Sequence, residues 1–135
     1  MSWLSLWLYA GWTLLLLAAI VGLRVYLSTT HQRAPNRFAP SGDDVSPLSG
    51  RLCRAHANCY ENLPVVGALL VVAGLTDNLD ITDSTALVLV AARIAQSVVH
   101  VCSTSNRAVT VRFTFFAVQI AIAGSWVLRL GLRLL

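Results

Sequence analysis

Long apolar stretches are the feature of this chain that most restricts what it can fold into. Residues 4–23 contain no charged side chain. About 20 apolar residues are enough for an α-helix to cross the hydrocarbon core of a bilayer. The apolar part of a cleavable signal peptide is shorter, roughly 7–15 residues, and usually follows a charged segment, which is missing here. We therefore expect this stretch to form a first membrane-spanning helix.

The composition supports the same class of protein. Of the 135 residues, 56% are hydrophobic and only 12% are charged. Soluble domains carry about 25% charged residues, so the composition predicts an integral membrane protein. The net charge of +4 comes from arginines in predicted loops and at helix ends. No basic run interleaved with aromatic residues is present, which argues against nucleic acid as a partner.

Three more stretches approach the length of a span, and the connections between them indicate how they are arranged. The linker at residues 28–50 contains three prolines, whereas the linker at residues 76–83 is short and acidic. Short connections favour antiparallel neighbours. The sequence thus predicts an all-α membrane protein. We expect one domain, residues 1–135, folded as a four-helix antiparallel transmembrane bundle with spans at about residues 3–27, 51–75, 84–102 and 109–130.

The distribution of arginines predicts the orientation in the membrane. The first loop and its flanks, and also the third loop, carry arginines, whereas the middle loop and the N-terminal tail carry neither lysine nor arginine. The positive-inside rule then places loops one and three in the cytoplasm and both termini outside, although Arg129 and Arg133 oppose this. We expect a multi-pass protein of a bacterial inner membrane. The arginines that support this orientation are Arg24, Arg33, Arg37, Arg51, Arg54, Arg107 and Arg112.

Polar side chains form a stripe on the second predicted helix. At about 100° per residue, Arg51, Arg54, Asn58 and Glu61 fall within roughly 80° of one another. Ionisable groups at membrane depth cost about 2.5–3.5 kcal/mol each, so they usually face a bundle interior or a watery cavity. The stripe is either a socket for a small zwitterion or anion, or an ion-paired set that holds helices together.

The third and fourth predicted helices repeat this pattern. Arg93, Gln96 and His100 share one face, as do Arg112 and Gln119. We expect Glu61 to pair with Arg93 or Arg112, because an unpaired carboxylate would be neutralised instead. For His100, contact with a ligand and a hydrogen bond between helices remain alternatives. Arg107 lies roughly 140° around the helix from Arg112, which favours a loop or interface position.

The segment Arg54-Ala-His-Ala-Asn-Cys-Tyr-Glu-Asn-Leu-Pro64 resembles a known signature. It is similar to the second-helix motif of the membrane-associated proteins in eicosanoid and glutathione metabolism, the MAPEG family. The resemblance covers nearly the whole chain, in order and with the right number of spans. Supporting matches are residues 36–43 in the first loop, Ala92-Arg93-Ile94 in the third helix, and either Asn106-Arg107-Ala108 or residues 112–116 in the fourth.

The resemblance implies a fold, an assembly and a ligand. Members of the family are four-helix bundles that assemble as homotrimers and bind glutathione between subunits in the cytoplasmic half. Matched position by position, Arg54, Asn58 and Glu61 would bind glutathione, and Arg93 would be mainly structural. Either Arg112 or Arg107 would stabilise the glutathione thiolate, and Arg112 keeps the better register with Gln119. The other residues expected around glutathione are Arg51, Gln96 and His100.

The functional hypothesis is a glutathione-dependent transferase or peroxidase that acts on lipophilic electrophiles from the bilayer, with glutathione as co-substrate. An arginine stabilises a thiolate without being able to quench it. The resemblance also leads us to expect a tyrosine near His100 and one on the fourth helix. Both are missing, which favours the alternative of a non-catalytic binding protein. A small transporter is disfavoured. Cys53, Cys59 and Cys102 form no CxxC pair, and the histidines lack the spacing of a metal site, so we expect no metal.

Overall fold

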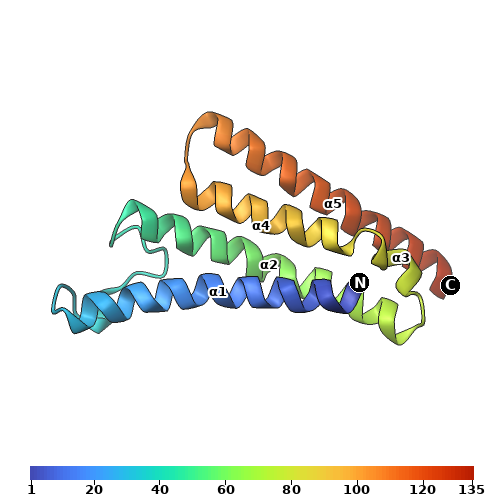
Figure 1. Ribbon diagram of the computed structural model, residues 1–135, viewed down its shortest axis with the longest axis horizontal. Helices are drawn as coiled ribbons and strands as arrows, with labels where there is room; N and C mark the ends of the chain where they lie inside the picture. Colours follow the sequence, from blue (N-terminus) through green and yellow to red (C-terminus); the bar gives the residue numbers. More distant parts are fainter.

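Four long helices run alternately in opposite directions in the computed structural model, which describes residues 1–135 (Figure 1). A short helix, α3, precedes the third long one, and a 3-10 turn, η1, lies in the first loop. The prediction of an all-α membrane bundle is confirmed. The elements are α1 (Ser2–Thr29), η1 (Pro35–Arg37), α2 (Pro47–Leu75), α3 (Leu79–Asp83), α4 (Ala86–Cys102) and α5 (Asn106–Leu134).

The four long helices differ in length. Helices α1, α2 and α5 have 28 or 29 residues and are long and apolar enough to cross a membrane. Helix α4 has 17 residues, about 26 Å at 1.5 Å per residue, and a turn separates it from α3. The apolar run predicts a helix in this region, but it does not predict that a turn separates α3 from α4.

Helices α2 and α5 begin earlier than their apolar stretches because serine caps start them. The Ser46 hydroxyl accepts a hydrogen bond from the Ser49 amide at 3.1 Å, and Pro47 occupies the first helical turn. The Ser105 hydroxyl accepts from the Ala108 amide at 3.3 Å. A side-chain oxygen at this position satisfies an amide that has no partner within the helix. The polar first turns of both helices are thereby ordered as helix.

The bundle is built on three helices that pack against one another, α1, α2 and α4. Helix α5 packs mainly on α4, touches α2 and makes no contact with α1. Tyr9 and Cys59 are completely buried where α1, α2 and α4 meet, and the Tyr9 hydroxyl donates to the Cys59 carbonyl at 3.3 Å. On α5, Trp126 is completely buried and its indole N–H donates to the Thr85 hydroxyl at 2.9 Å.

The first loop is held against α1 and α2. Arg24 donates to the Ala39 carbonyl at 2.9 Å, and Arg33 forms an ion pair with Asp44. The Ala39 amide, and then the charge of Arg33, hold the pKa of Asp44 below its usual value. Gly42 adopts a φ of +71° close to Ser49 of α2, a conformation and a spacing that suit glycine. The loop is thus a folded cover on the start of α2.

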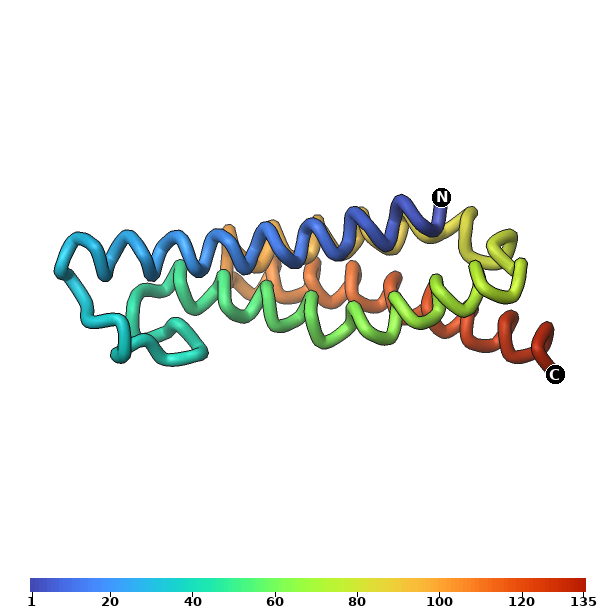
Figure 2. The backbone as a smooth tube through the Cα atoms, turned by 90° about the horizontal axis from the view of Figure 1, so that it is seen from below, coloured from blue at the N-terminus to red at the C-terminus, as the bar shows by residue number.

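The opposite end of the bundle is closed by the start of α1 and the end of α3, which lie side by side (Figure 2). The Ser2 hydroxyl and amide donate to one carboxylate oxygen of Asp83 at 2.6 and 2.8 Å. These bonds, with help from the N-terminal ammonium group, lower the pKa of Asp83 to about 2. Asp83 therefore caps α1 from a distant part of the chain.

Candidate functional site

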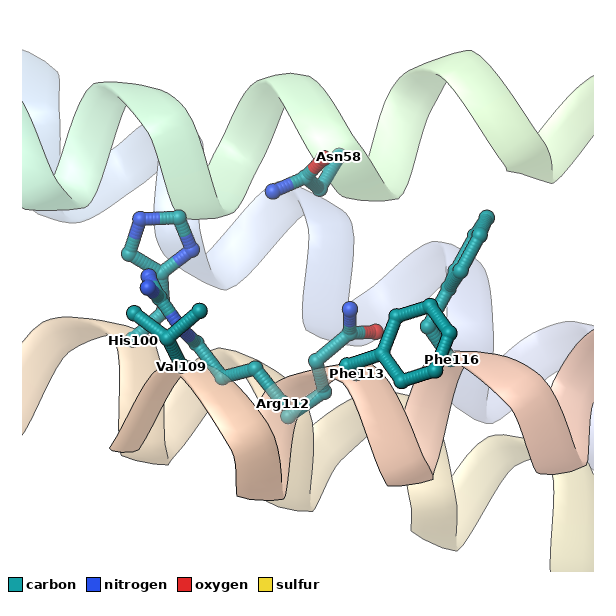
Figure 3. A pocket seen from close by; sticks show the side chains of 7 residues that line it. Asn58, His100, Val109, Arg112, Phe113 and Phe116 are labelled. Carbon is teal, nitrogen blue, oxygen red and sulfur yellow. The ribbon is translucent and has the colours of Figure 1, made fainter. Parts of the chain in front are cut away.

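A cavity of about 320 Å³ lies between α2, α4 and α5 and opens to the outside of the chain (Figure 3). Polar and apolar side chains share its wall. Three different helices contribute, and the polar residues are those that the helical stripes brought to one face. The lining residues are Asn58, Gln96, His100, Val109, Arg112, Phe113 and Phe116.

Helical spacing explains how these side chains meet. Gln96 and His100 are four residues apart on α4, and Arg112 and Phe116 are four apart on α5, so each pair occupies one face. The turn that joins the two helices is short, and the Ser103 hydroxyl donates to the Ser105 hydroxyl within it at 3.2 Å. The end of α4 therefore faces the start of α5. Asn58 of α2 lies across from them in Figure 3.

The polar groups of the cavity have few partners within the chain. The side chains of Asn58, His100 and Arg112 make no hydrogen bond or ion pair to protein atoms, while Arg112 reaches toward His100 (Figure 3). No carboxylate lines the cavity. An arginine provides up to five donors and a permanent positive charge. The cavity is therefore suited to an anionic group, beside the aromatic surface of Phe113 and Phe116.

Behind the cavity lies a buried polar network. Arg93 is only 2% exposed, donates to the side-chain oxygen of Gln96 at 3.0 Å and lies over the Tyr9 ring at 5.9 Å. Gln119 donates to the same oxygen of Gln96 at 3.1 Å. No carboxylate forms an ion pair with Arg93. The network thus contains a buried cation that is neutralised only by dipoles and by an aromatic face.

Several residues expected around a ligand lie outside the cavity. Arg51 donates to the Val101 carbonyl at 2.8 Å and thereby satisfies the end of α4. Arg54 is exposed and pairs with Asp43 of the first loop at 3.3 Å. Arg107 is exposed on the first turn of α5, with no side-chain partner. In the single chain these three arginines are separate from the group around Asn58.

The expected ion pair of Glu61 with Arg93 or Arg112 is wrong. Glu61 is exposed and forms no ion pair. The guanidinium of Arg93 instead points into the interior, where Gln96 and Tyr9 surround it. A helical wheel places a residue on a face, but the direction of a long side chain depends on which neighbouring helix covers that face.

Sequence reasoning missed the apolar half of the cavity wall and the part that Tyr9 plays behind it. Val109, Phe113 and Phe116 are ordinary residues of an apolar helix, and only their register with Arg112 indicates that they line a cavity. Nothing in the sequence around Tyr9 indicates that its ring lies against an arginine 84 positions along the chain. Its position follows from the packing of α1 on α4.

The cysteines and histidines show no arrangement for thiol exchange or metal binding. The three cysteines are free, with Cys59 buried, Cys102 exposed and Cys53 between these extremes. No group of three His, Cys, Asp or Glu side chains lies close enough to hold a metal ion.

Comparison with known proteins identifies a family. The model of the MAPEG family matches residues 2–132, nearly the whole chain. The match includes α1, α2 and α4, α5 as far as residue 132, and every residue of the cavity. Neither the comparison with curated proteins nor the one with solved structures gives a match.

Proposed function

The chain belongs to the MAPEG family, and on that premise we propose that it is a glutathione-dependent membrane transferase or peroxidase acting on lipophilic electrophiles. The family includes glutathione transferases and peroxidases. The observation that carries the proposal is the cavity, in which Arg112, His100 and Asn58 present unpartnered polar groups beside two phenylalanines. A polar thiol compound and an apolar acceptor can meet at such a boundary.

Arg112 is the residue that we assign to the thiolate. A free thiol has a pKa near 8.5, so most of it is protonated at neutral pH, whereas the thiolate is the nucleophile. A guanidinium in a poorly hydrated cavity stabilises the thiolate more strongly than it would in water. In conjugation, the sulfur forms a bond to the electrophilic carbon and the leaving group departs with the bonding electrons. In peroxide reduction, two thiols become a disulfide as the peroxide becomes an alcohol and water.

The remaining polar residues are assigned to the rest of glutathione. Asn58, Gln96 and His100 line the cavity and would form hydrogen bonds with glutathione. Arg51 and Arg54 would bind carboxylates, Glu61 would bind the amino group, and Arg93 would support Gln96 from behind. Arg54 and Glu61 are exposed in the single chain. Their part in the site therefore requires a neighbouring subunit, as a homotrimer would provide.

The bilayer supplies the second substrate in this proposal. The chain is an integral membrane protein, and Phe113 is 69% exposed on α5. Lipophilic electrophiles concentrate in the bilayer and would reach the cavity from the side of α5. With loops one and three in the cytoplasm of a bacterial cell, the cavity opens in the half of the bundle that cytosolic glutathione reaches.

A non-catalytic binding protein of the same fold is the second candidate. It is favoured by the side chains of the cavity, because no tyrosine, serine, threonine or cysteine lines it. A hydroxyl donor at the sulfur would then be missing. Under this alternative the protein binds a lipid or a metabolite without converting it. A small transporter is a third class, which the family match disfavours.

Calorimetric titration of the detergent-purified protein with glutathione tests the proposal. We expect saturable binding at millimolar concentration or below, together with conjugation of 1-chloro-2,4-dinitrobenzene. Binding without turnover of any electrophile or peroxide would support the non-catalytic alternative. The absence of binding at millimolar concentration would rule out the glutathione-dependent enzyme.

A further inference from the structure

The buried network behind the cavity contains a carboxamide whose orientation is determined by its neighbours. Gln96 lies between Arg93 on its own helix and Gln119 on α5, and all three side chains are at least nine-tenths buried. The Gln96 side chain also lines the cavity. Its two ends are chemically opposite, since the oxygen accepts hydrogen bonds and the nitrogen donates two. The end that faces the cavity therefore affects which ligand groups can bind there.

Arg93 and Gln119 together determine the orientation of the Gln96 carboxamide. A guanidinium has only donors, so the atom of Gln96 that lies 3.0 Å from Arg93 must be the oxygen. The same oxygen accepts a second hydrogen bond, from the Gln119 nitrogen at 3.1 Å. The Gln119 nitrogen also donates to the Phe115 carbonyl at 2.9 Å, which fixes the orientation of Gln119 as well. Two donors thus hold the Gln96 oxygen in the buried network, whereas the Gln96 nitrogen has no partner in the chain and is not among its fully buried atoms.

The arrangement has a cost that points to a function. The side-chain oxygen of Gln119 is buried and has no hydrogen-bond partner, and neither has the Nε group of Arg93. A buried polar group without a hydrogen-bond partner destabilises the folded protein. A leucine or methionine at position 119 would avoid part of this cost but would supply no donor to Gln96. The protein therefore keeps two polar side chains with unpaired buried atoms at a position that an apolar side chain could occupy.

We propose that Gln119, together with Arg93, is a positioning residue that holds the Gln96 carboxamide so that its N–H groups face the cavity. This wall then accepts an anionic group of the ligand and rejects a donor at the same place. The inference rests on the proposed function in one respect, namely that the ligand is a thiol compound with carboxylates. The group at Gln96 is then the thiolate or a carboxylate. Gln96 then adds an uncharged donor beside Arg112 in a cavity that no hydroxyl side chain lines.

Gln96→Glu tests the orientation most directly. The glutamate keeps an oxygen toward Arg93 and Gln119 but turns a second, negatively charged oxygen toward the cavity. We expect the melting temperature to be equal to or above that of the wild type, because Arg93 gains a carboxylate. We expect glutathione affinity to fall roughly 10- to 100-fold. Gln32→Glu, in the exposed first loop, makes the same change of charge and should alter neither quantity.

A double-mutant cycle tests the role of Gln119. Gln119→Met should weaken glutathione binding roughly three- to tenfold, because Gln96 is then held by one donor and can turn. In a Gln96→Met background, glutathione affinity should no longer depend on residue 119, so adding Gln119→Met should cause no further loss of affinity. A purely structural role for Gln119 would make the two losses additive. Additive losses, or unchanged affinity in Gln96→Glu, would overturn the proposal.

S-Methylglutathione distinguishes the two anionic groups. If Gln96 faces the thiolate, Gln96→Glu weakens glutathione binding and leaves the thioether nearly unchanged. If it faces a carboxylate, both compounds lose affinity equally. If the wild type binds neither compound, the proposed function fails, and the melting temperature of Gln96→Glu still decides the orientation. A fall of several degrees in that variant would show that the Gln96 oxygen does not face Arg93.

Discussion

The cavity and the far end of the bundle, formed by α3 and the start of α1, treat their polar groups in opposite ways. At the end formed by α3 and the start of α1, nearly every charge has a partner: Asp83 binds Ser2, Arg133 pairs with Asp80, and Arg129 donates to the Ile81 carbonyl. At the end that contains the cavity, Arg112, His100 and Asn58 have none. The difference separates stability from binding, since satisfied groups hold helices together and unsatisfied ones remain available for a ligand.

The largest effect that this comparison predicts is at the cavity. Arg112→Ala should lower the rate of conjugation about 10²- to 10³-fold, the usual consequence of removing one donor to a developing anion. The assembly, the melting temperature and the glutathione affinity should remain nearly unchanged, because Arg112 holds no other part of the chain. The assay is steady-state kinetics of glutathione conjugation to 1-chloro-2,4-dinitrobenzene, measured at saturating glutathione.

Arg107→Ala is the matched control for that variant. It removes the same side chain one and a half turns earlier on α5, from a position outside the cavity. We expect little change in rate. If the rates are reversed, Arg107 is the residue that stabilises the thiolate, and it must reach a cavity in a neighbouring subunit.

The second prediction concerns the closed end. Trp126→Phe should lower the free energy of unfolding by about 1–2 kcal/mol, because it removes the hydrogen bond to Thr85 and leaves a small void. Thermal unfolding in detergent measures this loss. Glutathione affinity should not change, and a loss of affinity without a loss of stability would contradict the separation of the two ends.

The third prediction uses the pKa of Asp83. Hydrogen bonds from Ser2 lower that pKa from an ordinary 3.8 to about 2 in the folded protein. The carboxylate therefore contributes stability above about pH 4, and this contribution is lost as the pH falls toward 2. Asp83→Ala should cost about 1 kcal/mol at neutral pH, as for other lost helix caps, and should remove this pH dependence. Melting curves at several pH values between these limits measure both effects.

The smallest expected effect is at the exposed pair of Arg133 and Asp80, whose atoms are 3.5 Å apart. Both side chains are about 60% exposed, and such pairs contribute only about 0.2–1 kcal/mol. Asp80→Asn should lower the melting temperature slightly, and added salt should remove the difference. A large fall in the melting temperature would mean that Asp80 has a further stabilising partner, such as the membrane surface.

Much of the cavity could be predicted from the sequence, because helix geometry is regular. Gln96 and His100 share a face for the same reason that Arg112 and Phe116 do, and loop lengths place those faces near each other. The partners of the long side chains could not be predicted. The destination of Arg93 depends on the ring of Tyr9, a residue that periodicity assigns only to an apolar face.

The contacts of the first loop could not be predicted from the sequence either. The pairing of Arg54 with Asp43 depends on how the first loop folds back over α2, and that path depends on the left-handed conformation of Gly42. Proline and serine content predicts that residues 28–50 form a loop, but it does not predict its path. The sequence likewise does not predict that Arg51 donates a hydrogen bond to the Val101 carbonyl at the end of α4.

The clasp between Ser2 and Asp83 joins residues that are 81 positions apart in the chain. During synthesis the N-terminal end of α1 therefore cannot form this hydrogen bond until α2 and α3 have left the ribosome. α1 and α2 can pair before that point, since the contacts of the first loop are already complete. The clasp then closes once the third segment is inserted, so a chain interrupted before Asp83 would keep a mobile first helix that is open to quality-control proteases.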